Sequence, residues 1–375
     1  MTINDWEKIE LETKEEIKPQ KVEKIENIEK DKLEITYIMV WTKVCGGSKI
    51  ILEYANRLAK KGHKINIVTY DEYPDWYELS DKINFVKVPE NEDIEKYIPN
   101  SDVVVPTSWK CIRKAIKANK GPVAFFEQGG LHLFEIDRLS EIKRKVVYDR
   151  MQLPPFIYTV SKYSAEKIEE IYGKSSSIIY NALESKIFYP REKERNEKET
   201  SITIVGSEDF KFKNVGEVLE VIRELKEKYQ IKLNWITQTE PKINIEEGKN
   251  AIVNPEQKII GDVLRNTDIY ICNSEYESFG LPTLEAMTCG ATVITTDTGG
   301  MRDFVIDREN ALVIKHHNKE DMKEKIEMLI NDKNLMHNIA QKGIITASKF
   351  NWNNTILSME KYFGEIAKYK VIDEI

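Results

Sequence analysis

Two glutamates separated by seven residues, Glu277 and Glu285, are the side chains whose type and spacing most directly suggest chemistry. Glu277 lies in a polar loop after an apolar run, residues 269–272, and Glu285 lies in the first turns of a predicted helix. A carboxylate at such a place binds phosphate poorly, but it readily accepts hydrogen bonds from sugar hydroxyls. The pair therefore indicates a ligand that presents hydroxyl groups.

The segment around the two glutamates has the features of an anion site. Gly280 and Pro282 stand where the helix begins, and a helix start beneath a glycine-bearing loop offers N–H groups and a positive dipole to a phosphate. A second apolar run, residues 291–295, leads to Gly299 and Gly300. Ligands bind at the carboxyl ends of strands in open parallel sheets. The pattern therefore predicts a diphosphate flanked by hydroxyl groups, as in a nucleotide sugar.

A simpler interpretation is that both glutamates only complement the helix dipole, each contributing about 0.3–1 kcal/mol. The wider string favours the functional interpretation. Residues 277–285 read ESFGLPTLE, and this string resembles the Glu-x7-Glu signature of the retaining glycosyltransferases of family 4, which have the GT-B fold. The resemblance continues through Gly290 and residues 298–300 to residues 310–312. It covers about residues 34–368.

The elements that must position these residues follow a regular alternation of short apolar runs and amphipathic segments. Strands are predicted at residues 35–41, 64–70, 83–88, 102–105, 122–126, 156–160, 201–205, 232–237, 269–272 and 291–295. Helices are predicted at residues 51–58, 108–118, 165–172, 215–229, 260–265, 283–287, 320–330, 334–347 and 352–367. Such alternation is typical of parallel α/β sheets. With the resemblance, it predicts a GT-B fold of two Rossmann-like, doubly wound domains that face each other across a cleft.

The chain is predicted to divide where its composition changes. A segment that resembles the family's interdomain connection ends at Pro190, and a charge-rich run follows it. The predicted parts are a charged helical or disordered appendage at residues 1–32, an acceptor-side domain at 33–190, a nucleotide-sugar-binding domain at 191–349, and a helix at 350–375 that crosses back to the first domain.

The loop after the strand at residues 201–205 supplies the predicted cations. In the family that the sequence resembles, this loop carries an arginine and then a lysine, and both contact the diphosphate. Lys213 stands at the lysine position, whereas Ser207 occupies the arginine position. Lys211 is the candidate replacement, although a lysine offers a point charge where an arginine offers a bidentate fork.

The first domain carries the predicted acceptor side. Gly46 and Gly47 follow its first strand and resemble the family's glycine-rich loop, while the simpler alternative is a tight turn. A later strand ends at Glu127 and Gln128, with His132 close behind. The resemblance implies a side chain at this strand end beside the donor sugar and the acceptor. Gln128 is the favoured match, and Glu127 and His132 are the other candidates.

Length and composition bound the class of protein. The chain has 375 residues, enough for two domains with full cores. Its net charge of −7 argues against nucleic acid or an anionic membrane as the main partner. The four cysteines lack CxxC spacing, and no apolar run is long enough to span a membrane. The sequence therefore predicts a reduced, cytoplasmic protein without an integral membrane segment, and it does not indicate the oligomeric state.

The predicted function is retaining glycosyl transfer from a nucleotide sugar, with a UDP-sugar favoured, to an acceptor hydroxyl in bacterial glycan or glycoconjugate synthesis. The resemblance implies that Glu285 holds the ribose hydroxyls, that Glu277 holds the donor-sugar hydroxyls, and that Lys213 stabilises the departing diphosphate. Further donor contacts are expected from Lys211, Phe279, Gly280, Leu281, Thr283, Gly299, Gly300, Gly46 and Gly47. No cofactor or metal is expected, because no Asp-x-Asp motif stands at the site. The acceptor can be a carbohydrate, a lipid-linked glycan, a protein or a small molecule.

Three other interpretations use the same residues. A GT-B epimerase would bind a nucleotide sugar without an acceptor, and a sugar phosphorylase would use orthophosphate without a nucleotide. A catalytically degraded module would bind a nucleotide sugar without turning it over. The absence of the arginine at Ser207 and the presence of Gln128 at the strand end motivate this last alternative.

Overall fold

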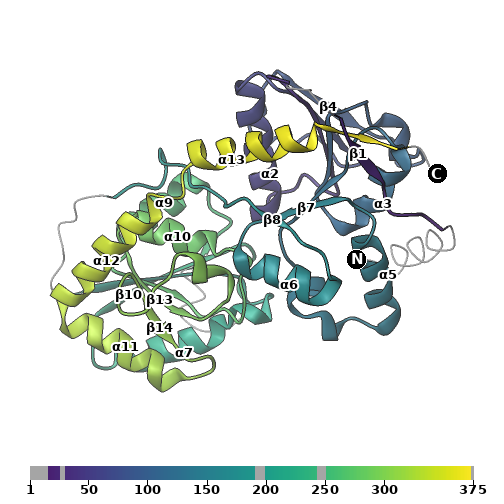
Figure 1. Ribbon diagram of the computed structural model, residues 1–375. Coiled ribbons are helices and arrows are strands. Elements are labelled where there is room, and N and C mark those ends of the chain that lie inside the picture. Colours follow the sequence, from purple (N-terminus) through teal and green to yellow (C-terminus); the bar gives the residue numbers. More distant parts are fainter. Residues whose placement is uncertain (1–15, 26–29, 191–198, 243–250, 373–375) are drawn as a thin grey trace. The chain divides into compact units, whose positions relative to one another are not determined.

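The structure, a computed structural model, describes residues 16–25, 30–190, 199–242 and 251–372. The chain forms two compact units (Figure 1). Unit 1 contains the residues up to Tyr180 together with those from Asn353 onward, and unit 2 contains Asn181–Trp352. Each unit is an α/β structure built on parallel strands, as the sequence predicts.

Unit 1 is organised around two short parallel sheets. Their strand orders are β4-β3-β2-β5 and β6-β7-β8. The bounds are Glu34–Met39 (β2), Lys64–Thr69 (β3), Ile83–Lys87 (β4), Val103–Pro106 (β5), Ala124–Glu127 (β6), Phe156–Thr159 (β7) and Ser177–Ile178 (β8). A parallel bridge between Val104 and Val123 joins β5 to the residue before β6. The two sheets therefore continue one another.

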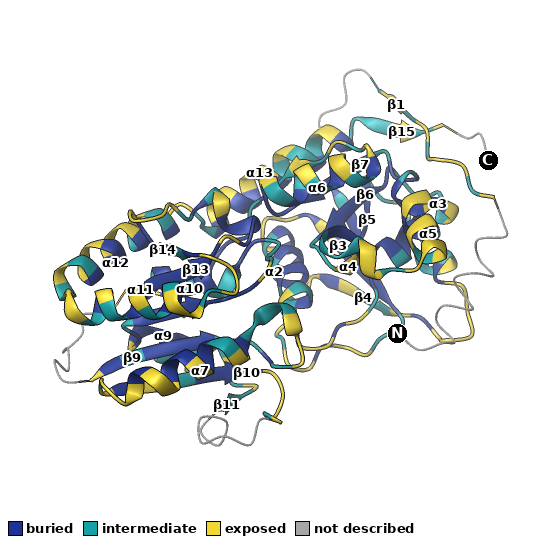
Figure 2. Cartoon of the chain, turned by 90° about the horizontal axis from the view of Figure 1, so that it is seen from below, coloured by how far each residue is buried: buried dark blue, intermediate teal, exposed yellow. Residues whose placement is uncertain are grey.

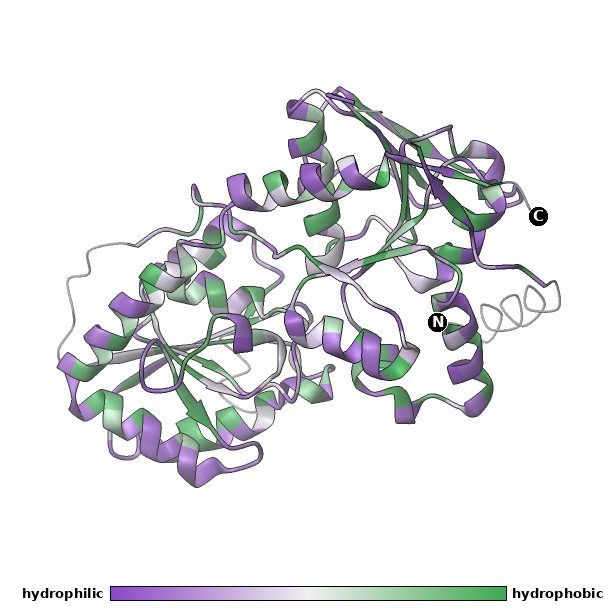
Figure 3. Cartoon of the chain, viewed as in Figure 1, coloured by the Kyte–Doolittle hydropathy of each residue, from purple (hydrophilic) through white to green (hydrophobic). Residues whose placement is uncertain are grey.

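The helices of unit 1 turn apolar stripes towards these sheets. They are Gly46–Lys60 (α2), Trp109–Ala118 (α3), Leu131–Phe134 (α4), Glu141–Met151 (α5), Lys162–Tyr172 (α6) and Trp352–Ile366 (α13), with short 3-10 turns at Ile94–Tyr97 (η1) and Ile136–Arg138 (η2). Apolar residues recur at helical spacing, so that one side of each longer helix is buried and the other is polar. Figure 2 shows this division as burial and Figure 3 shows it as hydropathy.

The appendage predicted at residues 1–32 is not a helix where the structure describes it. Val22–Lys24 forms strand β1, which pairs antiparallel with β15, Tyr369–Val371 (Figure 1). This pairing joins residues from opposite ends of the chain, so no local pattern could predict it. Residues 1–15 and 26–29 lie outside the described residues.

Gln20 fixes the chain as it approaches β1. Its side-chain amide donates a hydrogen bond to the carbonyl of Gly121 at 3.1 Å and accepts one from the N–H of Val123 at 2.9 Å. The backbone N–H of Gln20 donates to the carbonyl of Leu153 at 3.0 Å. One residue thus satisfies backbone groups at the amino end of β6, where the sheet would otherwise leave them unpaired.

Helix α13 belongs to unit 1 from Asn353 onward, and the sequence predicts residues 350–375 as a helix that crosses back to the first domain. Glu360 makes two polar contacts from this helix to the rest of unit 1. Its carboxylate accepts a hydrogen bond from His63 at 3.1 Å and lies 3.3 Å from the ammonium of Lys61. Both partners belong to the turn between α2 and β3.

Unit 2 has one six-stranded parallel sheet, in the order β11-β10-β9-β12-β13-β14. The strands are Thr200–Val205 (β9), Ile231–Thr237 (β10), Ile252–Val253 (β11), Ile269–Cys272 (β12), Thr292–Thr296 (β13) and Leu312–Ile314 (β14). β12 pairs with β9 on one side and with β13 on the other. Strands buried on both faces carry nearly continuous apolar runs, which explains why the sequence predicts these central strands well.

The helices of unit 2 enclose its hydrophobic core. They are Val215–Lys226 (α7), Gln257–Arg265 (α9), Leu281–Thr288 (α10), Lys319–Asn331 (α11) and Lys333–Ala347 (α12), with 3-10 turns at Lys211–Lys213 (η3) and Gly300–Asp303 (η4). The core includes Trp235 and Leu219, each 1% exposed. Across the parts of both units that the structure describes, no helix is both long enough and apolar enough to span a bilayer.

The chain passes from unit 1 to unit 2 at Tyr180 and not at the predicted Pro190. The connecting residues make their contacts within unit 2. The guanidinium of Arg265 donates to the carbonyl of Ile187 and lies 4.2 Å from the ring centroid of Tyr189. This buried arginine on α9 therefore fixes residues 187–189 to unit 2. The sequence prediction had placed these residues in the first domain.

Candidate active site

The predicted donor residues lie at the carboxyl edge of the unit 2 sheet. β9 and β12 are neighbours in the middle of this sheet, and the strand order runs outward from them in opposite directions. In open parallel sheets, ligands bind at such a switch point. Two loops meet there, residues 206–214 after β9 and residues 273–280 after β12.

Lys213 and Glu277 come from these two loops and form an ion pair. Nζ of Lys213 lies 2.5 Å from Oε1 of Glu277, and the hydroxyl of Ser274 donates to the same oxygen at 2.8 Å. Both charged side chains are largely buried, with 18% and 14% of their surfaces exposed. Burial acts to lower the pKa of Lys213, but Glu277 and Cys272 outweigh it, so that the pKa is raised above the ordinary lysine value. The ammonium of Lys213 is therefore kept charged.

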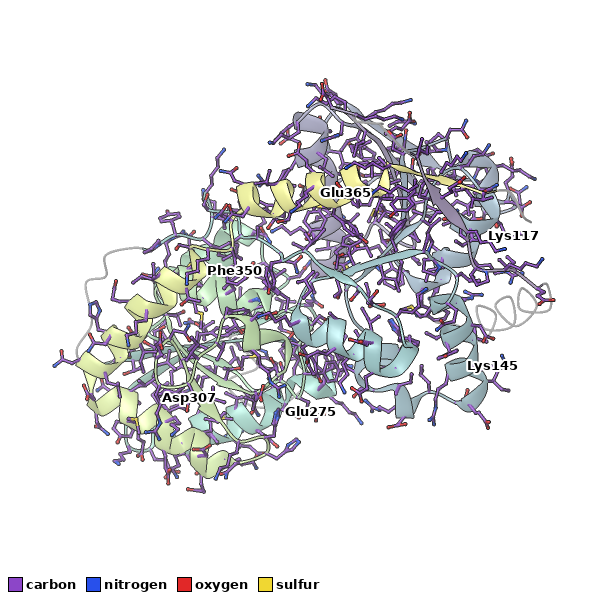
Figure 4. The ribbon with its side chains drawn as sticks, viewed as in Figure 1. Lys117, Lys145, Glu275, Asp307, Phe350 and Glu365 are labelled. Atoms are coloured by element: carbon purple, nitrogen blue, oxygen red, sulfur yellow. The ribbon has the colours of Figure 1, made fainter. Side chains whose placement is uncertain are left out.

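The residues on either side of Lys213 are anchored to the loop after β12. The carbonyl of Phe212 accepts a hydrogen bond from the N–H of Glu275 at 2.8 Å, and Figure 4 labels Glu275. Asn214 and Asn273 exchange bonds, because the side-chain amide of each donates to the other's carbonyl, at 3.3 and 3.4 Å. These contacts hold the backbone of Lys213 in place before any ligand binds.

Glycines let the loops after β12 and β13 approach each other. A Cβ on Gly300 would lie 2.1 Å from the carbonyl oxygen of Glu277, and a Cβ on Gly280 would lie 2.5 Å from Cγ of Met301. The N–H of Glu277 donates to the carbonyl of Thr298, and the N–H of Gly300 donates to the carbonyl of Glu277, both at 3.1 Å. Gly280 also has a φ of +86°, which favours glycine. The glycines predicted for ligand approach are therefore also required by the loop packing.

The other predicted donor-binding residues at the start of α10 differ in which of their groups can contact a ligand. The ring of Phe279 lies in the core, with its centroid 5.6 Å from Phe304 and 5.7 Å from Phe350, which Figure 4 labels. Thr283 is also buried, whereas Leu281 is half-buried. Phe279 can therefore contribute only backbone groups to a ligand, in keeping with an anion site made by a helix start.

Glu285 lies one turn into α10 and is half-buried. Burial raises the pKa of the neighbouring Tyr270 well above its usual range, and the carboxylates of Glu277 and Glu285 raise it further. The two glutamates of the signature therefore act on the same buried hydroxyl, which stays protonated.

Ser207, at the position where the sequence lacks the expected arginine, is buried and shapes its loop. Its hydroxyl forms a hydrogen bond with the hydroxyl of Thr239 at 2.7 Å and accepts one from the N–H of Asp209 at 3.2 Å. Lys211 is exposed on η3, and its side chain has no ion pair in the part of the chain that the structure describes. Its contact with a diphosphate stays a prediction.

Gly46 and Gly47 begin a helix in unit 1, although the sequence predicted them in a loop. Helix α2 starts at Gly46 because Cys45 caps it, with Sγ accepting a hydrogen bond from the N–H of Ser48 at 3.3 Å. A Cβ on Gly47 would lie 3.4 Å from Nε2 of Gln128. The structure thus brings the glycine pair and Gln128 together at the carboxyl edge of the unit 1 strands.

Glu127 and His132, the other candidates at that edge, form a buried pair. Oε2 of Glu127 lies 2.7 Å from Nε2 of His132, and Oε1 accepts a hydrogen bond from the N–H of Gly129 at 2.6 Å. The hydroxyl of Tyr172 donates to the carbonyl of His132 at 2.7 Å. With 2% and 8% of their surfaces exposed, both residues hold the loop, whereas Gln128 is half-buried beside Gly47.

Several residues of the site were not singled out from the sequence. Ser274 binds Glu277, and the ring of Tyr276 stacks on Phe212 with centroids 4.7 Å apart. Ser274 and Tyr276 could have been predicted as site residues, because they directly follow an apolar strand. Glu217 and His317 form a further ion pair at 3.0 Å beside these loops, and no local pattern connects them, because they are distant in sequence.

Residues 185–345 match the family model described as Glycosyl transferases group 1. An uncharacterised glycosyltransferase of Methanocaldococcus jannaschii is 27% identical over 217 residues, which cover 56% of this chain and 60% of that protein. A D-inositol 3-phosphate glycosyltransferase of Rhodococcus erythropolis is 33% identical over 96 residues, which cover 26% of this chain and 22% of that protein. The chain thus matches less than two thirds of the length of these relatives.

Solved structures show the same fold over most of the chain. Sucrose-phosphate synthase from Thermosynechococcus elongatus has a TM-score of 0.74 at 15% identity, covering 88% of this chain and 98% of that one. Anabaena HepE in complex with UDP-glucose has a TM-score of 0.71 at 11% identity, covering 89% of this chain and 98% of that one. Likeness at such low identity concerns the fold alone. The chain therefore has the GT-B fold, and its residues 185–345 are similar to the group 1 glycosyltransferases.

Proposed function

We propose that this chain is a retaining glycosyltransferase that moves a sugar from a nucleotide sugar to an acceptor hydroxyl. The observation that carries the proposal is the ion pair of Lys213 and Glu277 at the switch point of unit 2. A cation beside a carboxylate can bind a nucleotide sugar at the point where the diphosphate is bonded to the sugar. The ammonium can face phosphate oxygens, and the carboxylate can accept hydrogen bonds from sugar hydroxyls.

The proposed donor is a UDP-sugar. Support comes from HepE, which has the same fold and whose solved complex contains UDP-glucose. Glu285 would hold the ribose hydroxyls and Glu277 those of the sugar. Lys213, the backbone near Gly280, and Lys211 would contact the diphosphate.

In the proposed reaction, the bond between the anomeric carbon and the diphosphate oxygen breaks, and its electron pair leaves with the nucleotide diphosphate. The acceptor oxygen forms the new bond on the face that the diphosphate leaves, and the acceptor proton passes to a departing phosphate oxygen. Lys213 and the N–H groups at the start of α10 stabilise the developing charge. The scheme needs neither a covalent enzyme intermediate nor a metal ion, and an assay with and without EDTA tests the latter point.

The experiment that tests the donor site is thermal unfolding of the full chain with UDP, GDP, dTDP and ADP and their sugars. A ligand that binds the folded state raises the unfolding temperature by linkage. Selective stabilisation by UDP and by one UDP-sugar is expected, followed by slow hydrolysis of that sugar nucleotide. If no nucleotide shifted the unfolding temperature, the donor site would be contradicted.

A nucleotide-sugar-binding module without turnover is the second candidate. It is favoured by Ser207, whose buried hydroxyl is engaged within its own loop where an arginine is expected. Clear stabilisation by a sugar nucleotide without hydrolysis, transfer or epimerisation would select this candidate. Analysis of the sugar released in the same assay separates transfer and hydrolysis from epimerisation.

A further inference from the structure

The carboxyl edge of the unit 1 strands carries an unusual set of exposed aromatic side chains. Trp41 is 50% exposed and follows β2, while Tyr73 and Trp76 are 47% and 37% exposed and follow β3. Large aromatic side chains dominate the energetics of interfaces when they become buried. Their gathering at the edge where α/β sheets bind ligands points to a recognition surface.

The loops that carry these aromatic residues are locked together. The N–H and hydroxyl of Thr42 donate to the carboxylate of Asp71 at 2.8 Å and to the carbonyl of Glu72 at 2.5 Å. The indole N–H of Trp76 donates to the carbonyl of Thr42 at 2.7 Å. The backbone next to Trp41 is therefore fixed, and little conformational entropy is lost when a ligand covers its ring.

Two lysines of α3 lie over aromatic rings at this edge. Nζ of Lys110 is 5.7 Å from the ring centroid of Trp41, and Nζ of Lys114 is 5.0 Å from that of Tyr70. The two lysines are one helical turn apart, so they share one face of α3. Within the described residues, Lys114 and the nearby Lys43 form no ion pair. Two rings at this edge thus each have a lysine ammonium over them.

We propose, building on the glycosyl transfer proposed above, that this edge binds an acidic carbohydrate as the acceptor. One sugar ring would stack on the indole of Trp41, and its carboxylate or phosphate would pair with Lys110. Lys114 and Tyr70 would form the next position along an acidic glycan. Gly47 and Gln128, which follow β2 and β6 and lie close together, would face the hydroxyl that receives the sugar.

A structural role alone does not account for this arrangement. A cation over an exposed ring stabilises a fold only slightly, and it does not require half of a tryptophan to stay in water. A lipid surface is the other ligand that takes tryptophan with lysine. The aromatic residues, however, follow the ends of β2 and β3 at the ligand edge of the sheet and do not lie along one outer helix face.

The test uses two probes that share a ring and differ in charge, methyl β-D-glucuronide and methyl β-D-glucoside. Binding to the full chain is measured by ligand-observed NMR. The glucuronide is expected to bind at least about tenfold more tightly, because its carboxylate can form a charge-assisted hydrogen bond with the ammonium of Lys110. The preference should shrink as salt is added, because the lysines are not deeply buried.

Substitutions at Trp41 and Lys110 test which side chain contacts the sugar ring and which contacts its carboxylate. Trp41→Ala should abolish binding of both probes, Trp41→Phe should retain it, and Lys110→Gln should remove the preference for the glucuronide. Tyr148→Ala and Lys145→Gln on α5, at an exposed tyrosine and an exposed lysine, are the matched controls and should change nothing. Figure 4 labels Lys145.

The result that overturns the proposal is unchanged probe binding in Trp41→Ala and Lys110→Gln, or no probe binding by a protein that still binds UDP. Binding of phosphatidylglycerol vesicles that Trp41→Ala abolishes, without any binding of the glucuronide, would also overturn it in favour of a membrane surface. The shift of unfolding temperature with UDP is recorded for every variant. Failure of the donor site is thereby separated from failure of the acceptor surface.

Discussion

Lys213 and Glu277 neutralise each other before a donor binds, and this decides what a single substitution should do. Glu277→Gln removes the negative charge that competes with a diphosphate for the ammonium. We expect UDP to bind at least as tightly to this variant as to the wild type. Turnover should fall about 10²-fold, because the donor sugar loses a hydrogen-bond acceptor that orients it. Calorimetry with UDP and steady-state rates measure the two effects.

Glu275→Gln is the control for that variant, because Glu275 is two residues away and its side chain is 42% exposed. It should leave both UDP affinity and turnover near the wild-type values. Weaker UDP binding by Glu277→Gln would mean that the carboxylate supports the diphosphate site and does not compete with it.

A second prediction at the residue scale concerns glycine. Gly300→Ala places a Cβ 2.1 Å from the carbonyl oxygen of Glu277, so the loop must shift, and we expect a loss of about 1–3 kcal/mol in the free energy of unfolding. Gly216→Ala in α7 meets no atom within 4 Å and should stabilise by about 0.4–1 kcal/mol. Urea denaturation of both variants measures these opposite signs. A neutral Gly300→Ala would show that the loop has room that the structure does not indicate.

At the scale of elements, α13 depends on the carboxylate of Glu360. Burial acts to raise its pKa, but the hydrogen bonds from His63 and Lys61 outweigh it, so that the pKa is lowered. A carboxyl group with a lowered pKa in the folded state stabilises the protein above its unfolded pKa, about 4.3. That stabilisation is lost as the pH falls through the folded pKa.

Glu360→Gln should therefore lower the free energy of unfolding by about 1 kcal/mol at pH 7. The difference from the wild type should narrow below about pH 4, where the wild-type carboxyl becomes protonated. Thermal unfolding between pH 3 and pH 8 measures both. Glu365→Gln, on the same helix and labelled in Figure 4, removes an exposed pair with Lys368 and should have a smaller effect. A pH-independent loss in Glu360→Gln would mean that packing, not charge, is what was removed.

The elements also show what local sequence can predict. The central strands of the parallel sheets in the two units were predicted closely, because strands buried on both faces are continuous apolar runs between turns. Helix α5 was missed because Val146, Val147 and Met151 form only a narrow apolar stripe among charged residues. Strand β1 was missed because its partner, β15, lies at the other end of the chain.

Some features of the candidate site were likewise predicted from local sequence, and others were not. Glu277, Glu285 and Lys213 were found because a motif of fixed spacing carries them. The ion pair between Lys213 and Glu277 was not foreseen, because it depends on how two loops meet across the switch point. The cap on α2 was also missed, since glycine disfavours helices and cysteine rarely signals a helix start.

At the scale of the whole molecule, the two units differ in whether a single segment of the chain forms them. Unit 2 is one unbroken segment, Asn181–Trp352, and has its own hydrophobic core. Unit 1 is assembled from both ends of the chain, through β1, β15 and α13. A continuous segment with a complete core satisfies the conditions for independent folding.

We therefore expect residues 181–352, expressed alone, to fold and to bind UDP with a Kd within about threefold of the full chain, which corresponds to less than 1 kcal/mol. All the proposed donor contacts except those of Gly46 and Gly47 lie within this segment. The complementary fragment, residues 1–180, should unfold at a lower temperature than unit 1 of the full chain, because it lacks Glu360 and the strand that pairs with β1. Calorimetric unfolding and UDP titration of both fragments make the comparison. A folded 181–352 fragment that does not bind UDP would show that unit 1 supplies essential donor contacts, and the donor site proposed within unit 2 would then be incomplete.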